Sequence, residues 1–177
     1  RIHSNATQLA ELSETAKTIE SVAGNRSLSH EPIALDDLVR TTVETASQRY
    51  DDAEISLDAL PEITVSAGPH LETAIAELIE NAIEHNASEP STVKIGLEVS
   101  AETATVTVSD NGPGIPSEEW AVVTGDTEIS QLEHGSGLGL WLVRWVTEGY
   151  GGELTYHTRD NGSTISIQLP LCDAADP

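Results

Sequence analysis

The amino-acid sequence predicts an α/β fold, a two-layer α/β sandwich with three helices on one face of a mixed or antiparallel sheet. Three observations predict this class. Stretches with the 3.6-residue apolar period of a helix alternate with short stretches in which every second residue is apolar. The length of 177 residues suits one domain of ordinary size. Hydrophobic residues make up 38%, and their core must consist of Leu, Ile, Val and Ala because aromatics are only 3% and Phe is absent.

The first expected element is a helix over residues 1–23 that carries a heptad seam. Two rows of residues form the seam, and all but Asn5 are apolar: Ile2, Leu9, Ala16 and Ala23 in one row, and Asn5, Leu12 and Ile19 in the other. This narrow seam favours a segment of a helical bundle over a helix packed on its own domain. Gly24, Asn25 and Ser27–Ser29 then indicate a linker. We therefore separate residues 1–30 from a unit spanning 31–177.

Three helices and six strands are predicted in this second unit. The helices are expected at 36–50, 69–86 and 138–148. Asp36 is the expected N-cap of the first helix, Pro69 lies near the start of the second, and Gly149 ends the third. The strands are expected at 55–57, 63–65, 93–99, 104–108, 154–156 and 165–169. The polar stretch 111–137 is assigned neither helix nor strand.

The charge of the chain excludes several kinds of partner. There are 30 Asp and Glu residues against 8 Lys and Arg, which gives a net charge of −22. Such a surface repels DNA, RNA and anionic membranes. The longest apolar stretch, 138–146, is interrupted by Arg144 and is too short to span a bilayer. The single cysteine, Cys172, excludes an intramolecular disulfide and a CxxC-type metal site.

The same acidity indicates adaptation to high salt. Lys17 and Lys94 are the only lysines, and at molar salt a Debye length of ~3 Å screens the self-repulsion. We favour a protein from a salt-saturated cytoplasm over a surface that is acidic for solubility alone. Because neither a signal peptide nor an initiator Met is visible, we expect a cytoplasmic fragment of a longer protein.

The first functional motif lies on the second helix and runs Glu77-Leu-Ile-Glu-Asn81-Ala-Ile-Glu-His85. Glu77, Asn81 and His85 are spaced four apart, so they share one helical face. Asn is a mediocre helix former, and its place in a helix backed by apolar residues therefore requires a reason. Its amide oxygen is a hard ligand that suits Mg²⁺. Alone, this stretch is more typical of an exposed polar stripe than of a ligand site.

The second motif, Asp110-Asn-Gly-Pro-Gly114-Ile-Pro116, directly follows an apolar strand. A tight turn alone would explain its N-G and P-G dipeptides. Gly112 and Gly114 also let a backbone approach a flat ligand closely. Asp110 can accept a hydrogen bond from an amino group. The 6-amino group of adenine fits that acceptor, whereas guanine offers an oxygen there and would be repelled.

The third motif, Gly135-Ser-Gly-Leu-Gly139-Leu140, opens the third helix. Free backbone N–H groups and the helix dipole at such a start bind phosphate. A Rossmann fingerprint is disfavoured because polar residues, and no strand, precede the glycines. A Walker A loop is excluded because the chain has no Gly-Lys-Ser/Thr at this point.

Together, in this order and spacing, the three motifs resemble the N, G1 and G2 boxes of the Bergerat-fold ATPases, the superfamily of gyrase, heat-shock chaperone, histidine kinase and mismatch-repair ATPases. Residues 31–170 look most like the catalytic domain of sensor histidine kinases, with a haloarchaeal-like composition. The helix at 1–23 looks like the second helix of the kinase dimerisation hairpin. The resemblance implies a homodimer through this helix and a transfer of the ATP γ-phosphoryl group to a histidine on that hairpin. The receiver domain of a response regulator would then take the phosphoryl group.

The resemblance also implies a role for each motif residue. Asn81 would ligate a Mg²⁺ ion that bridges the ATP phosphates, and Glu77 would act as a general base or polarise the acceptor imidazole. Asp110 would bind the adenine amino group, and residues 115–134 would form a mobile lid over ATP. The remaining contacts to ATP would come from His85 and Gly112 and Gly114 near the base, and from His134, Gly135, Ser136, Gly137, Leu138 and Gly139 near the phosphates.

The sequence departs from the family pattern at three points. Glu84 stands where a basic residue often neutralises phosphates, which leaves that task to Mg²⁺ and His134. The usual Phe of the lid is absent, and Trp120 or Val122–Val123 are the candidates for its packing. No phosphoacceptor box is present, so this chain alone is not expected to autophosphorylate. Two alternatives stay open: an ATPase that hydrolyses ATP for conformational work, and a nucleotide-binding module without catalysis.

Overall fold

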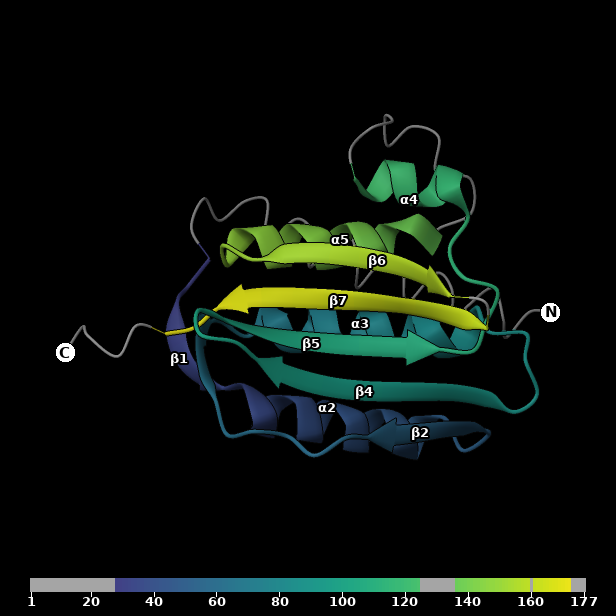
Figure 1. The fold of residues 1–177 in the computed structure, drawn as a ribbon, viewed down its shortest axis with the longest axis horizontal. Helices are drawn as coiled ribbons and strands as arrows, with labels where there is room; N and C mark the ends of the chain where they lie inside the picture. The colour runs from purple at the N-terminus through teal and green to yellow at the C-terminus, as the bar shows by residue number, and fades with distance from the viewer. Residues whose placement is uncertain (1–27, 125–135, 160, 173–177) are drawn as a thin grey trace.

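The computed structural model of the chain describes residues 28–124, 136–159 and 161–172. Within them, one five-stranded sheet has the strand order β2 (Ala53–Leu57), β4 (Ser91–Val99), β5 (Thr103–Asp110), β7 (Gly162–Pro170) and β6 (Glu153–Arg159). The β2–β4 pair is parallel and the other pairs are antiparallel, so the sheet is mixed (Figure 1). The helix expected at 1–23 lies outside the described residues.

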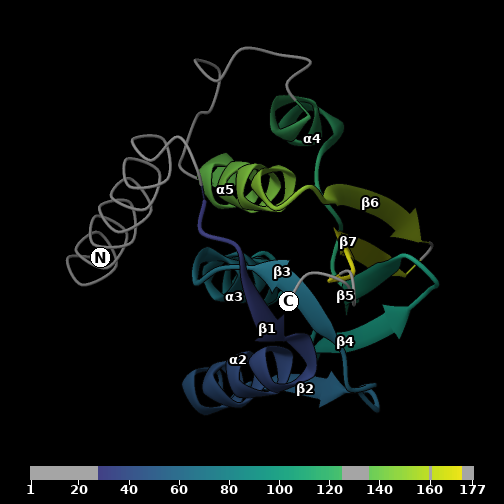
Figure 2. The same cartoon turned by 90° about the vertical axis from the view of Figure 1, so that its left-hand side faces the viewer.

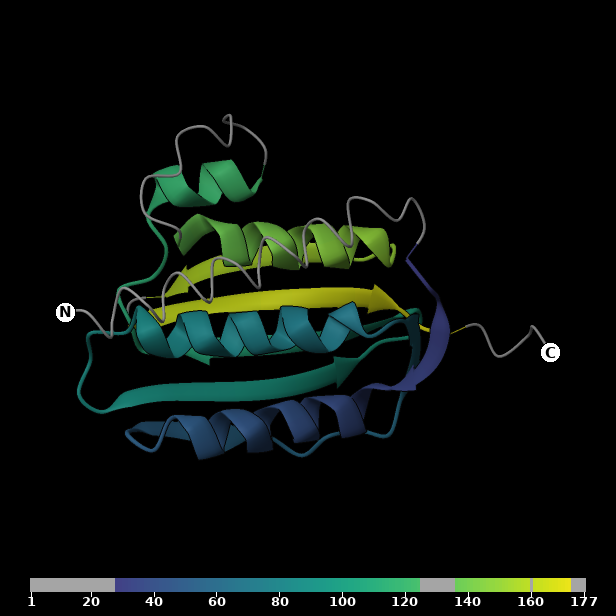
Figure 3. The same cartoon turned by 180° about the vertical axis from the view of Figure 1, so that it is seen from behind.

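Three helices cover one face of this sheet: α2 (Leu35–Arg49), α3 (His70–Glu84) and α5 (Ser136–Gly149). Seen along the sheet, the helices form one layer and the strands form the other (Figure 2). From behind, the three helices lie side by side in front of the sheet and run in roughly the same direction as its strands (Figure 3). The predicted sandwich is confirmed, and each helix begins and ends within two residues of its predicted limits. In the described ranges no helix is long and apolar enough to cross a membrane.

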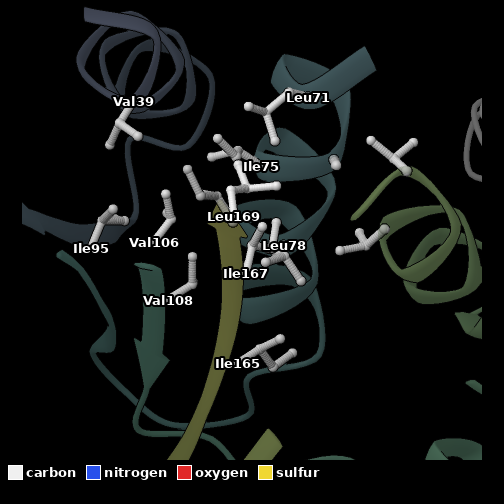
Figure 4. Close-up of a cluster of buried hydrophobic side chains, with 14 of the residues drawn as sticks. Val39, Leu71, Ile75, Leu78, Ile95, Val106, Val108, Ile165, Ile167 and Leu169 are labelled. Carbon is white, nitrogen blue, oxygen red and sulfur yellow. The ribbon is translucent and has the colours of Figure 1, made fainter. Parts of the chain in front are cut away.

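The core lies between the two layers, where side chains of the central strands meet those of α3 (Figure 4). Apart from Asp110 and Ser163 at one end, the helix-facing positions of β5 and β7 are buried and apolar, whereas the positions between them are mostly Thr and Ser. The buried members of this contact are Val106, Val108, Ile165, Ile167 and Leu169 from the strands and Leu71, Ile75 and Leu78 from α3. Because strand side chains alternate, Asp110 follows Val106 and Val108 on the helix-facing side. The end of β5 therefore carries a carboxylate into the space beneath α3.

Two short elements are absent from the sequence predictions. The strand β1 (Glu31–Ala34) pairs with β3 (Thr64–Ala67) in a separate antiparallel ribbon, at the end of the sandwich far from Asp110 (Figure 1). The helix α4 (Ser117–Val123) falls inside the polar stretch that was assigned no element, and it lies beside α5 (Figure 2). Both elements are short, and each depends on contacts with distant parts of the chain.

The predicted N-cap of α2 is wrong. The helix begins at Leu35, and Ala34 occupies the cap position without a side-chain hydrogen bond. Asp36 is buried instead, and its Oδ1 accepts a hydrogen bond from the Ile63 N–H at 3.3 Å. The carboxylate therefore ties the start of α2 to the chain that enters β3. In the same way Pro69 stands at the cap position of α3, one residue before the helix begins.

Candidate functional site

A cavity of about 250 Å³ lies at the end of β5, between α3, α5 and the segment 113–116. All three sequence motifs and the strand β7 contribute to its lining, which consists of Leu78, Asn81, Ala82, His85, Asn86, Val108, Asp110, Pro113, Gly114, Ile115, Pro116, Leu140, Ser163 and Ile165. Asn81, His85, Asp110 and Gly114 were predicted as site residues, and the fold brings these four together. Mostly apolar walls with a few convergent polar groups are typical of a small-molecule site.

Asp110 is held in the cavity by two hydrogen-bond donors. The Gly112 N–H donates to its Oδ1 at 2.7 Å, and the Ser163 hydroxyl donates to its Oδ2 at 2.6 Å. Each carboxylate oxygen is thereby fixed in direction, and each keeps a lone pair for a further donor. Sequence reasoning missed Ser163, which becomes visible only once β5 and β7 are paired in this register.

Gly162 allows β7 to begin beside Asp110. Its φ is +131°, a conformation that L side chains rarely adopt. A Cβ atom at this position would overlap the backbone carbonyl oxygen of Asp110. Glycine is therefore required here, and the position of Asp110 depends on it.

On α3, the Asn81 amide is oriented by its own helix. Its Nδ2 donates to the Glu77 carbonyl oxygen at 2.8 Å, so Oδ1 is the atom presented to a ligand. In the described parts of the chain, no group of three or more His, Cys, Asp and Glu side chains could hold a metal ion. A cation at Asn81 would therefore need ligands from a bound molecule, as Mg²⁺ accepts from phosphates.

Gly139 lies at the contact between α3 and α5. It is buried, and a Cβ atom there would meet the Glu77 carboxylate, with the Asn81 Nδ2 at 3.4 Å. The glycine thus brings the first turn of α5 against the helix face that carries Glu77 and Asn81. This packing places the free N–H groups at the start of α5 next to the Asn81 amide.

The two glycines of the second motif are both confined by neighbours. Gly114 has a φ of +79°, and a Cβ atom there would lie 2.6 Å from the Tyr156 hydroxyl oxygen. A Cβ on Gly112 would lie 3.0 Å from Asp110 Oδ1 and 3.2 Å from Asn86 Cγ. A larger residue at Gly114 would therefore be strained and crowded, and one at Gly112 would require the Asp110 and Asn86 side chains to shift.

Asn111, a residue that sequence reasoning missed, joins this segment to the loop after α3. Its Oδ1 accepts hydrogen bonds from Asn86 Nδ2 at 2.7 Å and from the Thr92 N–H at 2.9 Å. Its Nδ2 donates to the Pro90 carbonyl oxygen at 3.0 Å. His85 is exposed at the end of α3, next to this network, and it lines the cavity.

Glu84 is directed away from the cavity, toward α2. Its carboxylate accepts a hydrogen bond from the Tyr50 hydroxyl at 2.8 Å, and Glu80, one turn earlier, pairs with Arg49. Burial and the Glu84 hydrogen bond raise the pKa of Tyr50 above its usual range. The acid at position 84 therefore belongs to the contact between α2 and α3, and it does not add a negative charge to the cavity.

The predicted lid begins with a helix that is anchored to the domain. The Trp120 ring packs against the Tyr156 ring with centroids 4.9 Å apart, and Val123 is fully buried. Trp120 and Val123, two of the residues expected to replace the Phe of the lid, therefore supply the apolar packing of α4. His134 and Gly135 lie outside the described residues, and the backbone of Ser136, Gly137 and Leu138 forms the first turn of α5.

Comparisons with known proteins agree with this arrangement. The family model for the histidine kinase-, DNA gyrase B- and HSP90-like ATPases matches residues 67–173. The probable sensor histidine kinase TcrY of Mycobacterium tuberculosis is 28% identical over 97% of this chain and 37% of its own length. The solved ATP binding domain of PrrB from Mycobacterium tuberculosis has 25% identity and a TM-score of 0.68, covering 82% of this chain and 99% of that one.

A further solved structure shares the fold. The histidine kinase ThkA, crystallised in complex with the response regulator protein TrrA, has a TM-score of 0.76 at 21% identity and covers 94% of this chain and 49% of that one. The chain spans about a third of the length of the curated relatives it matches. The match to the family model begins at the end of β3, passes beyond β7 and includes the elements that line the cavity. The chain therefore belongs to the family of histidine kinase-, DNA gyrase B- and HSP90-like ATPases.

Proposed function

We propose that this chain is the ATP-binding catalytic domain of a sensor histidine kinase. In the reaction, a histidine imidazole nitrogen bonds to the γ-phosphorus of ATP, the bond from that phosphorus to the bridging oxygen breaks, and ADP leaves. One observation carries the proposal: Asp110, fixed by Gly112 and Ser163, shares a cavity with Asn81 at the start of α5. The proposal thus assigns a base acceptor and a cation ligand to one cavity, and the adjoining start of α5 to the phosphates.

The base would bind at the Asp110 end. With both oxygens already oriented, the carboxylate can accept a hydrogen bond from the adenine 6-amino group without reorganising. Guanine presents an oxygen at that position, which would face a negatively charged acceptor. The apolar walls from Val108, Ile115 and Ile165 suit a flat ring.

The phosphates would lie toward the first turn of α5. The backbone N–H groups of Ser136, Gly137 and Leu138 have no partners within the helix at this end, and the helix dipole favours negative charge there. The Asn81 Oδ1 would bind Mg²⁺ together with phosphate oxygens. When bound, this ion would neutralise charge on the transferring group. His134 and Gly135 complete the proposed phosphate contacts.

Glu77 is the proposed catalytic acid–base residue. Its carboxylate lies against Gly139 at the contact between α3 and α5, and Glu77 is outside the lining of the cavity. From there it would accept the proton of the attacking imidazole or polarise that ring. A water molecule in place of the imidazole would give ATP hydrolysis, so Glu77 also keeps the ATPase alternative open.

The proposed partners follow from the same assignment. Residues 1–30 would form the second helix and linker of a dimerisation hairpin, through which two copies pair. The first helix of that hairpin would carry the acceptor histidine, and a response regulator receiver domain would take the phosphoryl group. We also propose a cytoplasmic location and adaptation to high salt. The salt adaptation rests on composition alone, since the relatives named above include mycobacterial proteins and give it no support.

Titration calorimetry with ATP and GTP tests the nucleotide assignment. The wild-type chain should bind ATP in the presence of Mg²⁺ and discriminate against GTP. Asp110→Ala should weaken ATP binding by about ten- to a hundredfold, the cost of losing a hydrogen bond to a charged group. Asp58→Ala is the matched control, because Asp58 pairs with Lys94 outside the cavity. Equal affinity for ATP and GTP would remove the adenine role of Asp110.

A second experiment separates the kinase from the ATPase. The chain is mixed with the upstream hairpin of its parent protein and γ-labelled ATP. A kinase labels the hairpin with an acid-labile phosphohistidine, whereas an ATPase releases inorganic phosphate and leaves the hairpin unlabelled. Binding of ATP with neither product would support a module without catalysis.

A further inference from the structure

One wall of the cavity is held from behind by a side chain that is outside the cavity lining. Gly114 and Ile115 line the cavity, and the Tyr156 hydroxyl lies on the other side of this segment. That hydroxyl accepts a hydrogen bond from the Ile115 N–H at 2.7 Å, and it lies 3.4 Å from the Ile115 carbonyl oxygen, to which it can donate. The N–H and the carbonyl oxygen of Ile115 therefore both contact the Tyr156 hydroxyl.

Tyr156 itself is fixed in place by the sheet and by α4. It lies on β6 directly opposite Ile165, a residue that lines the cavity, and its side is the one that faces the helices. The Trp120 ring packs on its ring at 4.9 Å. The hydroxyl therefore has little freedom, and it defines how far the segment 113–116 stands from Asp110.

The helix that follows this wall is fixed at its other end as well. Its first turn is closed by the Trp120 N–H donating to the Pro116 carbonyl oxygen at 3.0 Å. Arg144 of α5 donates through Nη1 to the Val123 carbonyl oxygen at 2.6 Å. The Tyr156 hydroxyl therefore holds the wall at Ile115, between the Gly112–Asp110 hydrogen bond and α4, which Arg144 anchors at its C-terminal end.

We infer that Tyr156 is a positioning residue for the nucleotide base, acting through the backbone of Ile115. This inference rests on the proposed function, because it assigns the ring of adenine to the space that the wall encloses. Loss of the hydroxyl leaves the ring packing with Trp120 and releases only the wall. The base should then be held less firmly, so the whole nucleotide should dissociate faster. The contacts of the phosphates with α5 and Asn81 should not change.

The test compares Tyr156→Phe with Tyr50→Phe. Both variants lose one tyrosine hydroxyl, but Tyr50 bonds to Glu84 on the surface between α2 and α3. Binding of ATP and of ADP is measured by calorimetry, and release of a fluorescent ATP analogue by stopped flow. Tyr156→Phe should raise the Kd of both nucleotides by the same factor, about 3- to 10-fold, as expected for one ordinary hydrogen bond, with a matching rise in the release rate. Tyr50→Phe should bind like wild type.

Two further measurements exclude a general loss of structure. The ratio of the ATP Kd without Mg²⁺ to that with Mg²⁺ should be the same in Tyr156→Phe and wild type, because the phosphate end is untouched. Gly114→Ala should weaken binding less in the Tyr156→Phe background than in wild type, because the added methyl group then meets no hydroxyl. Independent effects of the two changes would count against the inference.

The outcomes are distinguishable. If wild type binds no nucleotide, the proposed function fails and the inference fails with it. If wild type binds ATP and Tyr156→Phe binds it with unchanged Kd and release rate, the inference alone is overturned. A drop in affinity accompanied by an altered Mg²⁺ ratio would show that Tyr156 acts on the fold of the whole site and would also overturn it.

Discussion

Ser163 and Asp110 face each other across the β5–β7 ladder, and the serine hydroxyl donates a 2.6 Å hydrogen bond to the Asp110 carboxylate. The two residues are 53 positions apart in the sequence. Ser163 is buried and occupies the inward position at the start of β7, where an apolar residue would be expected for packing. The hydroxyl at this position therefore serves to donate a hydrogen bond to the Asp110 carboxylate and does not contribute apolar packing.

The first prediction concerns this pair. Ser163→Ala should leave the fold intact and weaken ATP binding by about tenfold, because Asp110 loses the donor that fixes one of its oxygens. Calorimetry with ATP checks the affinity, and circular dichroism checks the fold. Ser166→Ala is the matched control, since Ser166 is on the same strand but faces away from the cavity and is outside its lining. An affinity in Ser163→Ala equal to that of the control would contradict the positioning role.

The second prediction concerns the cation. Asn81→Ala should abolish the Mg²⁺-dependent part of ATP affinity and leave the Mg²⁺-independent part, because only the amide oxygen is offered to the ion. The measurement is calorimetry with Mg²⁺ and with a chelator. Unchanged affinity in the presence of Mg²⁺ would show that the ion binds elsewhere.

The third prediction compares two glycines with positive φ. Gly162→Ala should lower the free energy of unfolding by about 2–5 kcal/mol, because strain adds to an overlap with the Asp110 carbonyl. Gly151→Ala should lower the free energy of unfolding by only about 1–2 kcal/mol, the cost of its φ of +74°. The added Cβ would meet no overlap, since its nearest neighbour, Pro170 Cγ, lies 3.9 Å away. Urea denaturation measures both values. Equal losses would mean that the contact with Asp110 is relieved by a small shift of β7.

The fourth prediction concerns salt. The melting temperature should rise steeply from low to molar KCl, because 30 acidic residues repel one another and 8 Lys and Arg residues can pair with few of them. Sucrose at matched osmolality is the control, since it stabilises compact states without screening charge. A melting temperature that is flat in KCl would mean that the acidity serves solubility alone.

The fifth prediction is that this chain does not label itself. His70 and His85 stand at the two ends of α3, His157 lies on β6 and His30 precedes β1, so none of these four lies in the middle of a helix as an acceptor histidine would. Incubation with γ-labelled ATP should leave no acid-labile label. Stoichiometric label on any histidine of the chain, located by mass spectrometry, would show that an acceptor is present in it.

Local pattern predicted most of the fold, because the elements that build the core carry their periodicity in consecutive residues. The alternation around Val106 and Val108 predicted β5, and the structure places Asp110 on the same side of the sheet as these two valines. The ribbon strand β1 has no such signal: it contains Pro32 and is a strand only because Ile33 pairs with Val65. The helix α4 has seven residues, too few for the helical period to be read.

The site residues that belong to a local motif could be predicted from the sequence. The site residues that contact the motifs only because distant segments pair could not. Asn81 and Asp110 follow from their own motifs. Ser163 contacts Asp110, 53 positions away, and Tyr156 contacts Ile115, 41 positions away. These contacts depend on strand pairing, which cannot be read from local sequence patterns. Glu84 was expected near the phosphates, yet the helix turns it toward Tyr50, because α2 packs on that side of α3.

The last strand of the domain completes the cavity through Ser163 and Ile165. During synthesis, β7 must therefore leave the ribosome before this cavity can be complete. A nascent or C-terminally truncated chain lacking β7 would have its nucleotide-binding motifs and still no closed site. Binding of ATP would thus indicate that β7 has paired with β5. Bound nucleotide would in turn stabilise the sheet that contains β7, because it binds only that state.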